Sequence, residues 1–238
     1  MAAPAFIHLR LHSEFSIADG TLRIADAVTA AAADAMPALA VTDLANAFGL
    51  VKFYKAARAR GIKPIFGCDA WLTHDAERDQ PFRALLIAQS RAGYLKLADW
   101  LTRAYSSNQY RGRAEIQQDW FDEGTEGLIA LSGARSGEVG AALSQGNATG
   151  ALKAAQRWAT LFPGRYYLEV QRAGHVDDNA LVAATARLAE EVGLPVVATH
   201  PVQFLRREDF RAHEARVCIA KGDELADPRR PREFTADQ

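Results

Sequence analysis

Cysteine is scarce in this chain of 238 residues, with only Cys68 and Cys218 present. Two cysteines cannot build a disulfide framework, so the small disulfide-stapled secreted folds are excluded and a reducing, cytoplasmic setting is predicted. No apolar segment reaches about 18 residues, so no membrane-spanning helix is expected. Residues 1–4 lack the basic flank and the apolar run of a signal peptide.

Excess charge is lacking as well, because 28 lysines and arginines face 29 aspartates and glutamates, for a net charge of −1. Such a chain has no global field that would attract nucleic acid or an anionic membrane, so any contact of that kind must be local. A glycine-rich turn is missing after the first two expected strands, which argues against a dinucleotide site. The apolar share of 49% and the charged share of 24% are ordinary for a globular protein.

The segment at residues 6–12 alternates between apolar and ionisable residues. Its apolar residues are Ile7, Leu9 and Leu11, and its ionisable residues are His8, Arg10 and His12. A period of two predicts a strand with one face in a core and the ionisable groups on the other face. Histidines and carboxylates at the end of a strand suit a metal site, but a guanidinium has no acceptor and cannot bind a cation. The pattern therefore indicates a metal site in which the positively charged Arg10 stands in the place of one ligand.

Strands and helices are expected to alternate along the chain. The predicted strands are the opening segment, 38–41, 63–72 with a break at Gly67, 83–88, 127–131, 166–171 and 195–198. The predicted helices run from a cap at Thr21 to about Ala35, and over 50–60, 93–105, 137–143, 148–162, 177–192 and 208–221. This order favours an α/β fold with a parallel sheet, closed as a distorted seven-stranded (βα)7 TIM-like barrel, with an open doubly wound sheet as the alternative. Segment 106–113 is expected to be mobile, and the tail from Asp223 to be extended and solvated.

Chemistry in TIM-like barrels sits at the carboxyl ends of the strands. The residues predicted there are His12, Asp19, Asp43, Asp69, residues 171–175 and His200. They would make a plausible metal centre if they met at one rim.

Several long blocks of the sequence resemble one known family. They are HLRLHSEFSIADG, AVTDLANAFGLVKFYKAARARGIKPIFGCDAWL, YYLEVQ and LPVVATHPVQF, in that order. Together they resemble the N-terminal polymerase-and-histidinol-phosphatase (PHP) domain of the bacterial DNA polymerase III α subunit. The resemblance implies a PHP barrel domain over residues 1–222 and, at DPRRPREF, an exit segment over residues 223–238 that leads to a polymerase palm outside this chain.

Metal-binding members of this family place about nine ligands around three ions, usually zinc, manganese or iron. By resemblance, three ligand positions are retained, at His12, Asp19 and Asp69. The other six positions are replaced, at Arg10, Leu44, Arg83, Ala173, Pro201 and Gln203. Three retained ligands cannot build a trinuclear centre, and a single zinc already needs three or four. The sequence therefore predicts a vestigial site, with no metal expected in this domain and Mg²⁺ required only by the polymerase domain beyond it.

Arg10 and Arg83 stand at two of the replaced positions, beside the retained acids Asp19 and Asp69. We expect the guanidinium groups to replace the positive charge of the metal and to pair with these carboxylates in bidentate geometry. The alternative is that both arginines reach outward as ordinary surface charges. His8, His175 and His200 are weighed as displaced ligands and are interpreted as structural or loop residues.

Other candidates receive structural interpretations. Cys68 is interpreted as a buried, inert thiol, and Glu169 has no clear partner in the sequence. A possible basic patch has acidic residues interleaved with it, which favours a solvated helix face; its members are Arg206, Arg207, Arg211 and Arg216. The four tryptophans are spread along the chain and are interpreted as core residues; they are Trp71, Trp100, Trp120 and Trp158.

Two classes of function follow from the resemblance. The first is a catalytically inactive domain that braces the polymerase and helps to dock the proofreading 3′–5′ exonuclease subunit. The parent chain would then be a DNA-directed DNA polymerase of the replication machinery, whose catalytic residues lie outside this chain. The second is a metal-dependent phosphoesterase, either an intrinsic 3′–5′ exonuclease or a pyrophosphatase, in which metal-bound hydroxide attacks phosphorus. The ligand positions favour the first.

Overall fold

The computed structural model describes residues 6–238, so the prediction for residues 1–4 falls outside the described part. It holds eight strands: β1 (Ala38–Val41), β2 (Lys63–Leu72), β3 (Phe82–Ala88), β4 (Gln109–Tyr110), β5 (Arg113–Ile116), β6 (Leu128–Leu131), β7 (Tyr166–Val170) and β8 (Val196–Ala198). The helices are α1 (Ile24–Ala33), α2 (Leu50–Ala59), α3 (Arg91–Ser107), α4 (Glu138–Ser144), α5 (Ala148–Leu161), α6 (Asp178–Val192) and α7 (Phe210–Lys221). Short 3-10 helices cover Gln118–Glu123, Ala134–Ser136 and Arg207–Asp209.

The chain divides into two compact units. The first unit comprises the chain up to Gly67, together with Ala173–His175 and His200–Gln238. The second unit comprises Cys68–Arg172 and Val176–Thr199.

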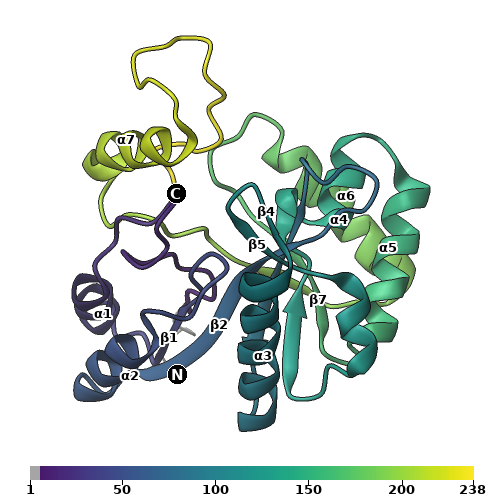
Figure 1. Ribbon diagram of the computed structural model, residues 1–238, viewed down its shortest axis with the longest axis horizontal. Coiled ribbons are helices and arrows are strands. Elements are labelled where there is room, and N and C mark those ends of the chain that lie inside the picture. Colours follow the sequence, from purple (N-terminus) through teal and green to yellow (C-terminus); the bar gives the residue numbers. More distant parts are fainter. Residues whose placement is uncertain (1–5) are drawn as a thin grey trace. The chain divides into compact units, whose positions relative to one another are not determined.

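In the first unit, β1 pairs in parallel with the start of β2, from Ala38 opposite Lys63 to Val41 opposite Phe66. Helices α1 and α2 pack side by side (Figure 1). Their apolar faces close a core whose buried members are Leu11, Leu22, Ile24, Ala27, Val28, Ala31, Leu39, Val41, Phe53, Ala57 and Ile62. Burying each large apolar side chain contributes about 1.5–3 kcal/mol to the stability of this unit.

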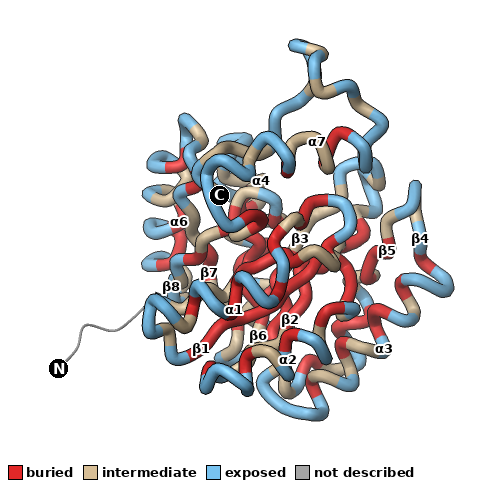
Figure 2. Tube along the Cα trace, turned by 90° about the vertical axis from the view of Figure 1, so that its left-hand side faces the viewer, coloured by how far each residue is buried: buried red, intermediate tan, exposed pale blue. Residues whose placement is uncertain are grey.

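In the second unit, the strands follow the order β4-β5-β2-β3-β6-β7-β8. The pairs β2–β5, β6–β7 and β7–β8 are parallel, whereas β3–β6 and β4–β5 are antiparallel. Buried residues follow β3, β6 and β7, while the outer turns of α6 are exposed (Figure 2). The α/β class and the mostly parallel sheet are thus confirmed, and the antiparallel β3 is a departure from the expected all-parallel sheet.

An aromatic cluster fills the core of the second unit. The ring of Phe121 lies 5.1 Å from that of Trp100 and 5.3 Å from that of Trp158, and Trp158 stacks on Tyr166 at 5.6 Å. Trp100, Trp120 and Trp158 are all buried, so their interpretation as core residues is confirmed. These contacts contribute both apolar burial and ring-edge electrostatics.

Several element predictions are corrected. The opening segment is not a regular strand, since only Leu11 forms an isolated parallel bridge, to Val202. Strand β2 continues through Gly67 without a break. Segment 106–113 holds the end of α3 and most of the β4–β5 hairpin, and its mobility stays a prediction. The expected count of seven strands therefore included the opening segment and omitted β4 and β5.

The start of helix α1 and the tail also differ from their predictions. Helix α1 begins at Ile24 after Arg23, which makes no side-chain cap, so Thr21 is not its capping residue. In the tail, the Arg230 guanidinium is paired with Glu214 and its side chain is only 8% exposed. The ring of Phe234 packs against His213 at 4.9 Å. The tail is therefore anchored to α7 and is not a fully solvated segment.

Candidate functional site

The retained residues His12 and Asp19 lie together in the first unit. Nδ1 of His12 lies 3.0 Å from both carboxylate oxygens of Asp19, so this nitrogen carries the proton and donates. Asp19 also accepts from Ser16 Oγ at 2.6 Å and from Gln203 Nε2 at 3.3 Å. Three donors thus converge on the Asp19 carboxylate.

The loop that carries Asp19 is fixed by its own backbone contacts. Gly20 N donates to Ser16 O at 2.7 Å, and a Cβ at Gly20 would lie 2.0 Å from Ser13 O. Only glycine permits this approach, so Gly20 sets the path that aims Asp19 at His12. His213, on α7, donates from Nε2 to the main-chain oxygen of Asp19 at 2.9 Å.

Asp43 lies two residues after the end of β1 and binds a different partner, Ser13. It accepts from Ser13 N at 2.6 Å and from Ser13 Oγ at 2.9 Å. Burial raises the pKa of this carboxyl, while the hydrogen bonds from Ser13 and the nearby His12 act in the opposite direction. Asp43 thus fixes the turn after the opening segment.

Asp69, the third retained residue, belongs to the second unit and faces an arginine. Arg83 Nε donates to Asp69 Oδ1 at 3.1 Å, and Arg83 Nη2 donates to Oδ2. The carboxylate is fully buried and the Arg83 side chain is 12% exposed. The predicted bidentate pairing of Arg83 with Asp69 is therefore confirmed. The outward-reaching alternative is wrong for Arg83, and also for Arg10, which is 5% exposed.

The remaining replaced positions also carry contacts. Leu44 N donates to Ser16 Oγ at 3.0 Å, Gln203 binds Asp19, and the carbonyl of Ala173 accepts from Thr235 Oγ1. Pro201 is buried. These positions serve the packing and hydrogen bonding of the first unit.

The first unit carries two further histidines with perturbed acidity. The rings of His8 and His200 lie 6.1 Å apart, and burial lowers the pKa of each, with His200 lowering that of His8 further. Nδ1 of His8 has no hydrogen-bond partner among residues 6–238. Both histidines line a cavity beside α1, which agrees with their structural interpretation. The prediction that Ile7 and Leu9 face a core is wrong, because both are only half-buried, whereas Arg10 and His12 are buried.

Sequence reasoning missed the buried carboxylate of Glu115 and found no partner for that of Glu169; both belong to the second unit. Glu115 accepts from Arg78 Nε at 3.3 Å and from Arg113 Nε at 3.2 Å. Glu169 accepts from Gln171 Nε2 at 3.1 Å and also from Thr199 Oγ1, so the expectation that it lacks a clear partner is wrong. The position of each acid at a carboxyl end of a strand, β5 or β7, was the available signal.

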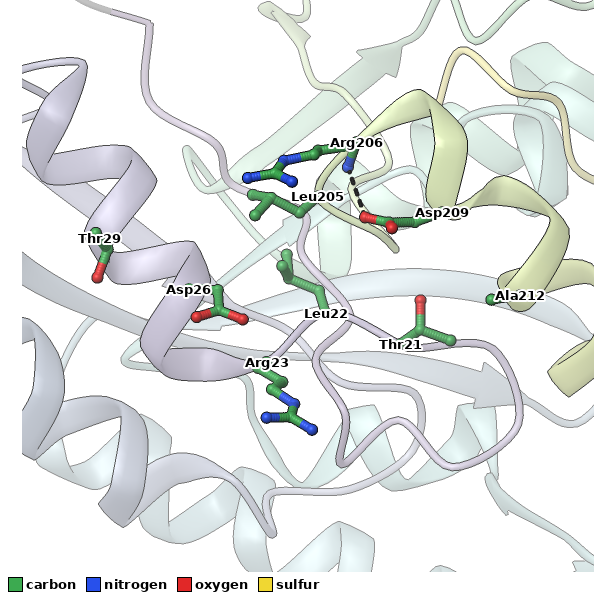
Figure 3. Close-up of a pocket in the computed structure, with 9 residues that line it drawn as sticks. All are labelled: Thr21, Leu22, Arg23, Asp26, Thr29, Leu205, Arg206, Asp209 and Ala212. Carbon is green, nitrogen blue, oxygen red and sulfur yellow. Dashed lines mark hydrogen bonds between the residues drawn. The ribbon is translucent and has the colours of Figure 1, made fainter.

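The groove at the amino ends of α1 and α7 contains arginines and aspartates in equal number (Figure 3). Arg206 N donates to Asp209 Oδ2 at 3.0 Å, and Arg23 and Asp26 lie on the α1 side. Alternating charges leave no excess positive charge there, in agreement with the interpretation of a solvated face.

The donor set does not fit a metal cluster. Across the described residues, no group of three or more histidine, cysteine, aspartate or glutamate side chains is placed to hold a metal ion. In the same part of the chain, no helix is long and apolar enough to cross a membrane.

Comparisons with known proteins agree on the family. The chain is 50% identical over 241 residues to the DNA polymerase III subunit alpha of Neisseria meningitidis serogroup B and 43% identical over 238 residues to that of Escherichia coli K12. Both alignments cover 100% of this chain but only 21% and 20% of the relatives, so the chain spans about a fifth of their length.

A solved amidohydrolase from Chromobacterium violaceum is similar in fold, with a TM-score of 0.56 at 16% identity, over 88% of this chain and 96% of that one. This likeness concerns the fold alone and agrees with the expected distorted TIM-like barrel. The family model of the PHP domain matches residues 8–173, which is more than half of the chain. The chain therefore belongs to the PHP domain family.

Proposed function

We propose that this chain is the catalytically inactive PHP domain of a replicative DNA polymerase III α subunit, working in the cytoplasm. Its role is to brace the palm and thumb of the same chain, while the parent protein performs template-directed nucleotidyl transfer with Mg²⁺. The observation that carries the proposal is the buried ion pair in which Arg83 binds Asp69.

The physical argument concerns charge. A buried carboxylate needs a compensating positive charge, which a metal ion supplies in a metal centre. At Asp69 a guanidinium supplies it and occupies both carboxylate oxygens. Arginine offers only donors, so the same position cannot bind a cation. At Asp19 the donors include His12, Ser16 and Gln203.

Metal content and turnover test this proposal. The purified chain, incubated with Mn²⁺ or Zn²⁺ and then desalted, is expected to hold less than about a tenth of an ion per chain. It is expected not to hydrolyse a phosphoester or pyrophosphate. Stoichiometric metal together with turnover that His12→Ala abolishes would overturn the proposal in favour of the metal-dependent phosphoesterase.

Docking of the proofreading exonuclease subunit is the second part of the proposal, and it rests on the family resemblance. The relatives are DNA polymerase III α subunits. A domain that has lost catalysis can still bind the exonuclease subunit through its surface. Surface plasmon resonance with the immobilised exonuclease subunit tests this part. Saturable binding of the 238-residue chain is expected, and the absence of binding contradicts it while leaving the bracing role intact.

A further inference from the structure

The outward face of α2 has a charge distribution unlike that of the whole chain. Residues 44–68 contain no aspartate or glutamate but hold five basic residues, namely Lys52, Lys55, Arg58, Arg60 and Lys63. All five are exposed. Lys52 pairs with Glu14 at 2.6 Å, whereas the other four make no ion pair with a carboxylate in the described part of the chain. A local positive surface thus exists on a chain of nearly zero net charge.

Apolar side chains are interleaved with these charges. Phe48, Val51 and Tyr54 are 60%, 64% and 53% exposed. Along the helix, Val51, Lys55 and Arg58 fall at i, i+4 and i+7, opposite the buried Phe53 and Ala57. Tyr54 stands three residues after Val51 and four before Arg58, so its ring adjoins these cations, and Phe48 lies in the turn just before the helix.

Ordinary roles for these residues do not account for the whole set. Cations near a helix carboxyl end complement its dipole, which suits Arg58 and Arg60. That effect is confined to the last turn, so it gives no reason for Lys55 or for the exposed rings. A merely solvated helix face carries both signs of charge, but no acidic residue is present on α2.

We propose that this surface, defined by Phe48, Val51, Tyr54, Lys55 and Arg58 and called the α2 face, binds single-stranded nucleic acid. The cations would neutralise successive phosphates, and the rings of Phe48 and Tyr54 would stack on unpaired bases. This combination is the one by which proteins hold single strands without reading their sequence. Duplex DNA buries its base faces, and an acidic peptide has no bases, so neither uses the rings in this way.

Fluorescence anisotropy of a labelled oligothymidylate of about 20 nucleotides tests the charges. The double variant Lys55→Glu/Arg58→Glu is expected to weaken binding at least about tenfold, and to lower the slope of log affinity against log salt by about 1.4, measured between about 50 and 200 mM salt. The matched control is Lys153→Glu/Arg187→Glu, with the same charge change at exposed positions of α5 and α6. The control is expected to bind within about twofold of the parent.

The rings are tested separately. Phe48→Ala and Tyr54→Ala are each expected to weaken single-strand binding roughly fivefold or more, with the salt slope unchanged. A control variant that loses as much affinity as the α2 variant overturns the proposal. So does equal affinity for a duplex of the same length with the rings dispensable, and so does displacement by oligoglutamate as effective as that by unlabelled oligothymidylate. An undetectable complex at the lower salt concentration also overturns it.

Discussion

Arg83 binds both carboxylate oxygens of Asp69, and the carboxylate is fully inaccessible to solvent. The same guanidinium lies 5.1 Å from the centre of the Trp71 ring, within the range of a cation–π contact. A fixed positive charge therefore occupies the place where the family resemblance puts a ligand.

Removing Arg83 tests how much the Arg83–Asp69 ion pair contributes to the free energy of unfolding. Arg83→Ala removes the guanidinium that binds the buried Asp69 carboxylate, so the free energy of unfolding should fall by about 3–5 kcal/mol. Urea denaturation followed by circular dichroism measures it. The control, Arg111→Ala, breaks the exposed pair with Asp79 and should cost less than about 1 kcal/mol. Equal losses in the two variants would show that Arg83 contributes no more than a surface charge.

The Asp19 network should respond in a similar way. Asp19→Ala removes the acceptor of His12, Ser16 and Gln203 together, at about 1–3 kcal/mol for each donor left buried without a partner. Asp26→Ala, on the exposed side of α1, is the control and should cost less than about 1 kcal/mol. A thermal midpoint of Asp19→Ala equal to that of the control would contradict the network's structural role.

Gly20 should not tolerate a side chain. Because an added Cβ would lie 2.0 Å from Ser13 O, Gly20→Ala must displace the loop that holds Asp19. The expected cost is about 3 kcal/mol, at the upper end of overpacking effects. Gly61→Ala, where no atom lies within 4 Å of the added carbon, should cost about 1 kcal/mol from its left-handed backbone. Chemical denaturation of both variants measures the two losses in the free energy of unfolding, and equal losses would contradict the prediction for Gly20.

The aromatic core of the second unit offers a test of packing. Phe121→Ala should lower the free energy of unfolding by about 3–5 kcal/mol, since the ring contacts Trp100, Trp158 and Phe162. Phe48→Ala, at an exposed ring, should change it by less than about 0.5 kcal/mol. A large loss in Phe48→Ala would mean that the α2 face is part of the core and not a binding surface.

Acid should destabilise the chain through its buried histidines. Burial lowers the pKa of His8, His200 and His213 from 6.5, so below that pH the unfolded state binds protons that the folded state does not. Stability is therefore full above pH 6.5 and is lost as the pH falls through the lowered values. Nδ1 of His213 has no acceptor within the described residues, which is consistent with the lowered pKa of this histidine.

The measurement compares unfolding free energies at about pH 7.5 and about pH 5.5. His213→Gln should reduce the loss between these two values, because one titrating group is gone. A pH dependence in His213→Gln as steep as in the parent would contradict the assignment.

The sequence by itself determined the α/β order of elements and most helix positions, because local periodicity marks helices and strands. The pairing of Arg83 with Asp69 was predicted from the family resemblance, together with the need of a buried acid for a positive charge. The β4–β5 hairpin was missed although Gly112 marks its two-residue turn, where Arg111 also has a positive φ of 49°.

Only the tertiary structure decided which polar groups are buried and which residues are their hydrogen-bond or ion-pair partners. Glu115 accepts from Arg78, which is 37 residues away, and Asp19 accepts from Gln203, which is 184 residues away. The reversal of β3 and the burial of Arg10 likewise depend on contacts between segments far apart in sequence. Periodicity records which side of an element is apolar, whereas the partner of a buried charge is set by the fold that brings it there.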